Sequence, residues 1–366
     1  MRVGVAHSTS SHHDARFRRR EQAAEERSQF FRLRERNRYS RLCFSIGFTS
    51  ESSSACNHDP DVFPSKPVRP QIFNEPAWRT VSSVGEFRDD IAMNEADLTD
   101  IIRRAFAEDL PDITSEAVFA PSDRGSARFL VKADGVIAGL ATIEAVLRTL
   151  DPSAEIVMNA RDGDAVTAGN IVAEVRASII ALLSGERTAL NLMQRASGIA
   201  TMTRRYVDAV AGTSAKIYDT RKTAPGLRAL DKYAVKAGGG ENHRIGLHDM
   251  FLVKNNHIDR AGSITAALQR IRARQMPQQI MVEVRDMREL DEALALTPDF
   301  ILLDNMDLDQ LRDAVARTRG RVPLEASGGI TIETVRAVAE TGVDRISVGT
   351  LTHSVTALDI SMRIGT

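Results

Sequence analysis

Cationic side chains gather in one short stretch of this sequence, YDTRKTAPGLR at residues 218–228. Arg221, Lys222 and Arg228 lie here, although the net charge of the whole chain is only -1. Residues 216–260 hold nine Lys or Arg, five acids and three histidines. Arg binds carboxylates and phosphates through paired hydrogen bonds. The composition of this region therefore predicts a local site for a small polyanion.

Glycines later in the chain suit the phosphate part of such a ligand. The sequences EASGGI, residues 325–330, and SVGT, residues 347–350, each contain a predicted strand end. Glycine-containing turns in the last units of a β/α barrel are the usual place where backbone N–H groups bind a phosphate. The predicted phosphate-binding residues are Ser327, Gly328, Gly329 and Gly349.

Two carboxylates end neighbouring predicted strands, Glu283 in VEV and Asp304 in LLDNM. Beside a phosphate site, two carboxylates indicate Mg²⁺ ligation, directly or through water, and they could equally hold sugar hydroxyls. No Ser-His-Asp order and no lone activated nucleophile stands out. The residues therefore favour catalysis by binding and electrostatics over a covalent mechanism.

These residues are positioned by an alternation of short strands and amphipathic helices. The predicted strands are 216–218, 250–253, 280–284, 300–303, 322–325 and 345–348. Alternating strands and helices indicate a parallel sheet. Six near-equal units without a GxGxxG after the first strand favour a barrel over a dinucleotide-binding fold. Polar or small residues at the strand ends then meet at one edge of the barrel.

The preceding part of the chain has a different pattern. Residues 127–140 and 159–177 each read as two strands around Gly-containing turns, which predicts two hairpins. A helix is predicted from the apolar spacing of residues 185–210. Arg187 would lie in its first turn, where a cation opposes the helix dipole.

Residues 1–92 differ from the rest of the chain. Eleven Arg and five acids lie between Arg2 and Arg41, and periodic apolar patterning is poor. This composition predicts a mostly disordered extension, with the folded part beginning at Met93. The acids argue against a transit peptide. Cys43 and Cys56 are the only cysteines, so a disulfide framework is not expected, which fits a cytoplasmic protein.

The bulk composition excludes other classes of protein. No run approaches the roughly 18 apolar residues that a membrane span needs. A chain of 366 residues with a balanced charge has no global basic field, so nucleic-acid binding is not expected.

Seven motifs together resemble quinolinate phosphoribosyltransferase, also called nicotinate-nucleotide pyrophosphorylase (carboxylating). They are GERTALNLMQRASGIAT, DTRKTAPGLRALDKYAVKAGGGENHR, VKNNHI, VEV, LLDNM, EASGGI and VGTLTHS. The resemblance covers about residue 94 to the end. It implies an α/β protein, with an α/β sandwich domain at 93–195, joined by 352–366, and an incomplete barrel of about six strands at 196–351. It also implies transfer of phosphoribosyl from phosphoribosyl pyrophosphate to quinolinate, with Mg²⁺ and loss of CO₂, in NAD biosynthesis.

The resemblance also implies roles for particular residues in a homodimer with shared sites. Arg187 would reach across the dimer to a quinolinate carboxylate. Quinolinate and pyrophosphate would be bound by Arg221, Lys222, His243, Arg244 and Lys254. Lys222, Glu283 and Asp304 would be the catalytic residues, the two carboxylates holding Mg²⁺ or the ribose hydroxyls. A cationic His243 would favour a dianion.

Three alternatives remain from the sequence. One is a phosphoribosyltransferase of the same fold that acts on another aromatic acid, such as nicotinate. Another is a barrel that binds phosphoribosyl pyrophosphate without turnover. The third is a nucleic-acid-binding role for the Arg-rich residues 1–92.

Overall fold

The computed structural model describes residues 93–365, and the predicted extension at 1–92 lies outside the described residues. The described part begins with two helices, α2 (Glu95–Asp109) and α3 (Ile113–Val118). Each is capped by the residue before it: Asn94 Oδ1 accepts the Ala96 N–H, and Asp112 Oδ1 accepts the Thr114 and Ser115 N–H groups. Such caps satisfy the N–H groups that have no partner in a first helical turn.

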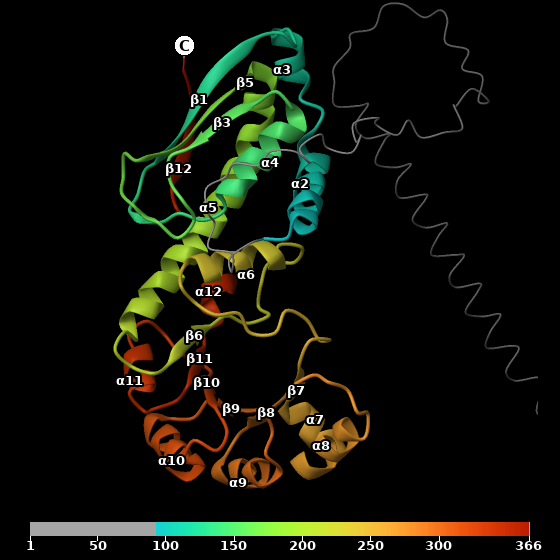
Figure 1. Cartoon of the computed structure of the whole chain (residues 1–366), viewed down its shortest axis with the longest axis vertical. Helices are drawn as coiled ribbons and strands as arrows, with labels where there is room; N and C mark the ends of the chain where they lie inside the picture. Colours follow the sequence, from blue (N-terminus) through green and yellow to red (C-terminus); the bar gives the residue numbers. More distant parts are fainter. Residues whose placement is uncertain (1–92, 366) are drawn as a thin grey trace, which may run out of the picture. The chain divides into compact units, whose positions relative to one another are not determined.

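An antiparallel sheet forms the first part of the fold (Figure 1). Its strands lie in the order β12-β1-β5-β3, so the last strand of the chain pairs with the first. Helix α5 packs against this sheet, and helix α4 (Leu140–Leu150) packs against α5. The strand bounds are β1 (Arg124–Val131), β3 (Glu155–Met158), β5 (Ile171–Ser178) and β12 (Ile360–Gly365).

The two predicted hairpins are wrong. Strand β1 pairs with β5 and β12, whereas β2 (Gly135–Val136) pairs with β4 (Ala165–Val166) in a separate two-stranded sheet. Turn signals locate where a strand ends but do not say which strand it pairs with next. Here both turns send the chain to a different sheet.

Helix α5 (Ile179–Ala209) connects the antiparallel sheet to the rest of the molecule. Ser178 Oγ caps it by accepting the Ala181 N–H, so the helix begins six residues before the predicted start at 185. Arg187 therefore lies inside the helix, and the expectation of a first-turn cation is wrong. The predicted domain boundary at residues 195 and 196 falls within this single helix and stays a prediction.

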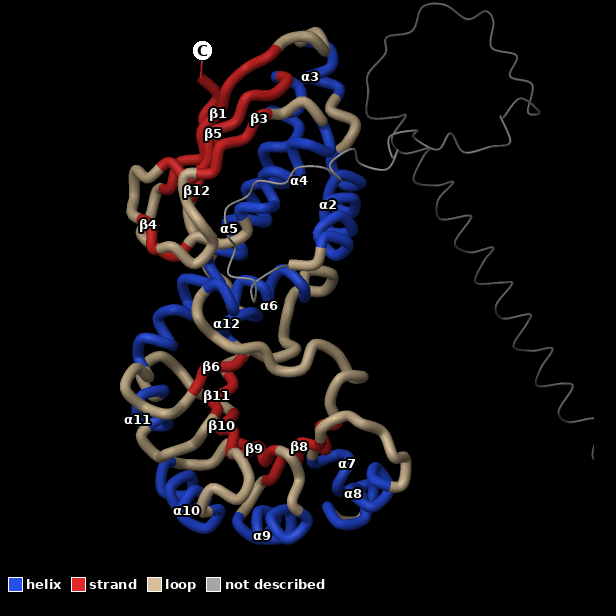
Figure 2. Tube along the Cα trace, viewed as in Figure 1, coloured by secondary structure: helices blue, strands red, loops and turns tan. Residues whose placement is uncertain are grey.

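A parallel sheet of six strands forms the second part, in the order β6-β11-β10-β9-β8-β7. Strands β6 and β7 are the two edges, so the barrel is open (Figure 2). Each strand lies within two residues of its predicted position, because short apolar runs between turn residues are a clear signal. The bounds are β6 (Lys216–Tyr218), β7 (Phe251–Val253), β8 (Ile280–Val284), β9 (Phe300–Asp304), β10 (Leu324–Ser327) and β11 (Arg345–Ser347).

Helices follow the strands and cover the outer face of this sheet (Figure 2). Helix α6 (Arg228–Ala237) packs against α5, and the short α12 (Thr350–His353) also contacts α5. The remaining helices are α7 (Asn255–Ala261), α8 (Ile264–Arg272), α9 (Met287–Leu296), α10 (Leu308–Thr318) and α11 (Val335–Ala339). None of the helices in residues 93–365 is both long and apolar enough to cross a membrane.

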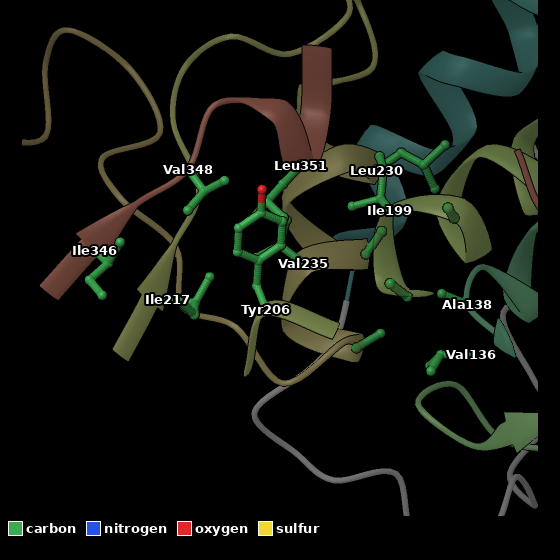
Figure 3. Packing of buried hydrophobic residues seen from close by; sticks show 14 of the residues in the cluster. Val136, Ala138, Ile199, Tyr206, Ile217, Leu230, Val235, Ile346, Val348 and Leu351 are labelled. Atoms are coloured by element: carbon green, nitrogen blue, oxygen red, sulfur yellow. The ribbon is translucent and has the colours of Figure 1, made fainter. Parts of the chain in front are cut away.

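One hydrophobic core runs through both parts of the fold. Figure 3 shows its middle, where Ile199 and Tyr206 of α5 face Leu230 of α6 and Ile217 of β6. Ile199 and Leu230 are fully buried, and burying such a side chain contributes about 1.5–3 kcal/mol. Helix α5 thus fixes the antiparallel sheet against the strands that carry the predicted site.

Candidate active site

A cavity of about 650 Å³ lies where the parallel strands end. This volume falls in the usual range for small-molecule sites, about 300–1,000 Å³. Of the predicted site residues, all but Arg187 line it. They are Arg221, Lys222, His243, Arg244, Lys254, Glu283, Asp304, Ser327, Gly328, Gly329 and Gly349. Residues up to 128 positions apart in the sequence, from 221 to 349, are therefore neighbours here.

Backbone pairing brings the two cationic segments together. The Glu241 N–H donates to the Ile217 carbonyl at 2.7 Å, and the Asp219 N–H donates to the Glu241 carbonyl at 3.0 Å. The segment after the glycines at 238–240 therefore continues alongside β6. As a result, His243 and Arg244 lie opposite Arg221 and Lys222, which follow the end of β6.

A buried ion pair holds the backbone of the segment that carries His243. Lys232 Nζ lies 2.6 Å from Asp219 Oδ1 and also donates to the His243 carbonyl at 2.9 Å. Asp219 Oδ1 accepts the His243 N–H at 2.8 Å, so both backbone groups of His243 are held. Burial raises the pKa of Asp219 to about 6, although Lys232 opposes the shift. The pair positions His243 and does not line the cavity itself.

Arg221 and Arg244 lie close enough for their charges to interact, and Arg221 has a buried donor without a partner. Burial lowers the pKa of Arg244, and the nearby charge of Arg221 lowers it further. Arg244 Nη1 donates to the Met250 carbonyl at 3.0 Å, while the buried Nε of Arg221 has no hydrogen-bond partner. Buried donors without a partner cost roughly 1–3 kcal/mol each. An anion between the two guanidinium groups would satisfy this donor and relieve their repulsion.

His243 has its ring orientation set by two neighbours. The Arg244 N–H donates to His243 Nδ1 at 2.7 Å, so the proton of the neutral ring is on Nε2. Nε2 lies 3.4 Å from Oε1 of Glu325, which is fully buried. Oε2 of the same carboxylate lies 2.9 Å from Arg345 Nε, and Arg345 stacks on Tyr218 with 3.8 Å to the ring centre.

Carboxylates occupy the other side of the cavity. Glu283 is on β8 and Asp304 ends the neighbouring strand β9. Lys254 Nζ lies 3.0 Å from Glu283 Oε2, so Lys254 is partly neutralised. The lining as a whole contains four Lys or Arg and three Asp or Glu. The cavity thus has a cationic side and an acidic side.

The acidic side has the chemistry that a magnesium ion requires. Mg²⁺ is typically bound by one or two carboxylates, with water and substrate phosphates as the other ligands. Glu283 and Asp304 supply two such carboxylates facing one cavity. Among residues 93–365, no group of three or more His, Cys, Asp or Glu forms a complete metal site. These two residues therefore fit a metal that arrives with a phosphorylated substrate.

The glycine residues form a small cup next to the cationic side. Gly328 and Gly329 have φ angles of 104° and 62°, in the left-handed region that favours glycine. A Cβ on Gly328 would lie 2.2 Å from Asn305 Oδ1, so no side chain fits there. A Cβ on Gly349 would lie 3.0 Å from Lys222 Cδ. The glycines therefore leave the backbone accessible and leave room for the Lys222 side chain.

Arg187 does not belong to this cavity. Its side chain is 63% exposed and contacts Glu186, with 2.8 Å between Nη2 and Oε1. Its placement within α5 leaves the guanidinium on the surface of the single chain. A role for Arg187 in the site therefore requires a second copy of the chain.

Several residues that line the cavity were not predicted from the sequence. Glu325 lies at a predicted strand end without a predicted role, and Asn305 has a φ angle of 56° that places its side chain over Gly328. The asparagine after Asp304 was the available signal, because Asn tolerates this conformation. The other unassigned polar residues in the lining are Thr220, Thr331, Ser347, Thr350 and His353.

Comparison with known proteins identifies the family. Residues 112–197 match the family model "Quinolinate phosphoribosyl transferase, N-terminal domain", and residues 199–363 match the corresponding C-terminal domain. A probable nicotinate-nucleotide pyrophosphorylase (carboxylating) of Bacillus subtilis is 44% identical over 275 residues, covering 74% of this chain and 95% of the relative. The chain belongs to the quinolinate phosphoribosyltransferase family.

Further relatives agree with this assignment. A probable nicotinate-nucleotide pyrophosphorylase of Synechocystis is 47% identical over 245 residues, covering 66% of this chain and 83% of the relative. The crystal structure of NadC from Streptococcus pyogenes superimposes with a TM-score of 0.72 at 37% identity, covering 75% of this chain and 98% of that one. The predicted family, fold class and decarboxylating phosphoribosyltransferase activity are confirmed.

Proposed function

We propose that this member of the family converts quinolinate and phosphoribosyl pyrophosphate to nicotinate mononucleotide, pyrophosphate and CO₂ in the cavity described above. The observation that carries the proposal is the neighbouring pair Arg221 and Arg244: burial and the charge of Arg221 lower the pKa of Arg244, and the buried Nε of Arg221 has no hydrogen-bond partner in the protein. Quinolinate offers two adjacent carboxylates to such a pair. Guanidinium groups bind carboxylates through paired hydrogen bonds, which fixes the orientation of the ring.

The neighbouring residues would bind different parts of the second substrate, phosphoribosyl pyrophosphate. The cup at Ser327, Gly328, Gly329 and Gly349 would hold the 5′-phosphate through backbone N–H groups. Lys222 passes beside Gly349, so its ammonium group is available to the pyrophosphate. Lys254 is paired with Glu283 and would contact the ligand next to the acidic side. The ribose would then lie between the cup and the carboxylates.

Glu283 and Asp304 would hold Mg²⁺ together with the pyrophosphate oxygens, or would accept hydrogen bonds from the ribose hydroxyls. When bound, the metal would neutralise charge on the departing pyrophosphate. Lys222 adds a second positive charge at the same group. Preorganised charges of this kind stabilise the transition state because they need no rearrangement as the bond breaks.

In the remaining steps of the reaction, the main role of the protein is to position quinolinate. The quinolinate ring nitrogen attacks the anomeric carbon of the ribose as the bond to pyrophosphate breaks. The ring nitrogen is then cationic and stabilises the electron pair that stays on the adjacent carbon when its carboxylate leaves as CO₂; a proton from solvent then adds to that carbon. Arg221 and Arg244 would hold the other carboxylate and keep the reacting group away from bulk water.

A homodimer with shared sites accounts for Arg187. Its exposed guanidinium lies outside the cavity of its own chain, so it would reach the quinolinate carboxylate in the site of the partner. Arg187→Ala and Arg221→Ala homodimers are each expected to be inactive. After subunit exchange, a hybrid dimer would hold one site without either substitution and should regain activity. No recovery, with exchange verified by native mass spectrometry, would contradict the shared site.

Substrate choice is the direct test of the proposed function. The purified chain is incubated with phosphoribosyl pyrophosphate, Mg²⁺ and either quinolinate or nicotinate, and the mononucleotide is measured by chromatography. Turnover with quinolinate alone is expected, because two arginines match a diacid. Turnover with nicotinate alone would instead assign the alternative specificity for a monoacid. Cytoplasmic localisation is a further part of this proposal, in keeping with its small soluble substrates.

A further inference from the structure

The loop that carries Arg221 and Lys222 is held by side chains behind the cavity. Thr352 Oγ1 in α12 donates to the Lys222 carbonyl at 2.9 Å. Two residues further along, the Ala224 N–H donates to Asp231 Oδ2 in α6 at 3.0 Å. Neither Thr352 nor Asp231 lines the cavity. The backbone of the loop is thus fixed on both sides of Thr223.

Arg195 of α5 joins these two contacts. Its Nε donates to Asp231 Oδ1 at 2.8 Å, and its Nη2 donates to Asp231 Oδ2 at 2.7 Å. The same Nη2 donates to the Thr352 carbonyl at 3.1 Å. Asp231 is fully buried and Thr352 is 1% exposed, so water does not compete for these groups. Three helices therefore meet in one continuous hydrogen-bond network behind the loop.

The network also reaches the phosphate cup. The Thr352 N–H donates to the Gly349 carbonyl at 3.2 Å, and Gly349 is the glycine beside the Lys222 side chain. Thr352 therefore contacts the backbone of both parts of the site.

We propose that Thr352, together with Arg195 and Asp231, is a positioning residue that holds Lys222 at the pyrophosphate end of the cavity. This inference rests on the proposed assignment of Lys222 to the substrate site. A lysine side chain is flexible, so its ammonium group is placed accurately only if its backbone is fixed. Small displacements of a catalytic group can reduce a rate by roughly a hundredfold.

A substitution at Thr352 tests the proposal. Thr352→Val keeps the shape and removes the hydroxyl donor, whereas Thr352→Ser keeps the donor. We expect kcat/KM to fall roughly tenfold to a hundredfold in the valine variant and to remain near the parent in the serine variant. Thr318→Val is the matched control, because Thr318 is also 1% exposed but its hydroxyl has no hydrogen-bond partner.

A double-mutant cycle with Lys222→Ala separates positioning from general stability. If Thr352 acts through Lys222, adding Thr352→Val to Lys222→Ala causes no further loss of kcat/KM. A purely structural role would lower Tm and leave kcat/KM of the folded enzyme unchanged. Equal losses in both backgrounds, or a valine variant with the parent kcat/KM, would overturn the proposal.

Two further outcomes are distinguishable. If Lys222→Ala alone retains full activity, the assignment of Lys222 to the site is wrong and the proposal falls with it. If Thr352→Val is unfolded at the assay temperature, Arg195→Lys takes its place in the cycle. That variant keeps the charge but loses the paired hydrogen bonds of the guanidinium group to Asp231. The same loss of kcat/KM is expected, and it should be absent in the Lys222→Ala background; a loss that persists there would contradict the proposal.

Discussion

At the scale of single residues, the site depends on charges that the protein itself leaves incompletely paired. Arg221 and Arg244 illustrate this: each is part of a fixed backbone segment, and together they have fewer acceptors than donors. Lys254, by contrast, is already paired with Glu283. The three cations therefore differ in how far the protein already pairs their charge, a difference that the sequence alone does not show.

Lys222 is the residue with the largest expected effect on turnover. Lys222→Ala removes the positive charge proposed to face the departing pyrophosphate, and loss of one such group typically lowers kcat by about 10²–10³-fold. We expect Tm to stay within a few degrees of the parent, because the side chain lines a cavity. The variant is compared with Lys216→Ala, whose side chain is 66% exposed on the edge strand β6. Full activity of Lys222→Ala would remove the residue from the mechanism.

Gly328 provides a test of the phosphate cup. Gly328→Ala places a Cβ 2.2 Å from Asn305 Oδ1 and requires a left-handed φ of 104°. We expect KM for phosphoribosyl pyrophosphate to rise at least roughly tenfold, with a smaller change for quinolinate. Gly169→Ala is the control: φ is 96° there, but a Cβ would meet nothing within 4 Å. Equal changes in KM for both substrates would indicate a general distortion of the cavity.

At the scale of elements, helix ends fix the segments that lead into the sheets. Asp112 at the start of α3 is the most connected of these caps, since its carboxylate accepts hydrogen bonds from Ser115, Ser184 and the Thr114 N–H. These donors lower the pKa of Asp112 to about 2. The cap also joins α3 to α5, because Ser184 belongs to the long helix.

Asp112 therefore makes stability depend on pH in acid. Its pKa is lower in the folded chain than in the unfolded one, so its contribution is present above about pH 4 and is lost as pH falls through 2. Asp112→Asn should be less stable than the parent at pH 7, with the difference shrinking below pH 4. Urea unfolding at several pH values measures this. Asp309→Asn, at a side chain 94% exposed, should show no such convergence.

At the scale of the whole molecule, the antiparallel and parallel parts of the fold are joined by α5 and by a polar contact between α6 and the turn before β4. The Tyr233 hydroxyl of α6 donates to Asp162, which lies in the turn before β4 and also accepts the Leu140 N–H at 3.1 Å. Burial raises the pKa of Asp162, and the Tyr233 hydrogen bond opposes that shift. This contact ties the helix behind the cationic loop to the antiparallel part.

Removing the Tyr233 hydroxyl should weaken this junction in a pH-dependent way. In Tyr233→Phe the buried carboxylate loses a donor, so the free energy of unfolding should fall by about 1–3 kcal/mol at pH 7. The pKa of Asp162 would rise further. Stability should therefore recover as the pH is lowered and the carboxyl becomes protonated. Tyr206→Phe is the control, because the Tyr206 hydroxyl lies 3.4 Å from Thr350 Oγ1 and not beside a carboxylate; its stability should not recover at low pH. An equal pH dependence of stability in both variants would refute the role of the Tyr233 hydroxyl beside Asp162.

The sequence predicted the parallel part of the fold well and the antiparallel part poorly. Six apolar runs correspond to the six strands, because each strand forms within one local run, and the alternation with helices makes the sheet parallel. One of the two partners of β1 is β12, more than two hundred residues away, and no local pattern contains that information. The extension at 1–92 and the domain boundary stay predictions.

The candidate site was predictable where residue type determines chemistry. Arg221, Lys222 and the glycines were found because charge and backbone freedom can be read directly from the sequence. Glu325 and the network of Thr352, Arg195 and Asp231 were missed, since a buried polar residue looks like any other until its neighbours are known. Arg187 was assigned by resemblance alone, and the single chain leaves it outside the cavity.

The most direct test of the account is the stoichiometry of the reaction. Quinolinate labelled in both carboxyl groups is incubated with the purified chain, phosphoribosyl pyrophosphate and Mg²⁺, and labelled CO₂ and nicotinate mononucleotide are both quantified. The account predicts one labelled CO₂ for each mononucleotide, one label retained in the product, and neither product without phosphoribosyl pyrophosphate. A mononucleotide that retains both labels, or CO₂ released without any mononucleotide, would contradict it.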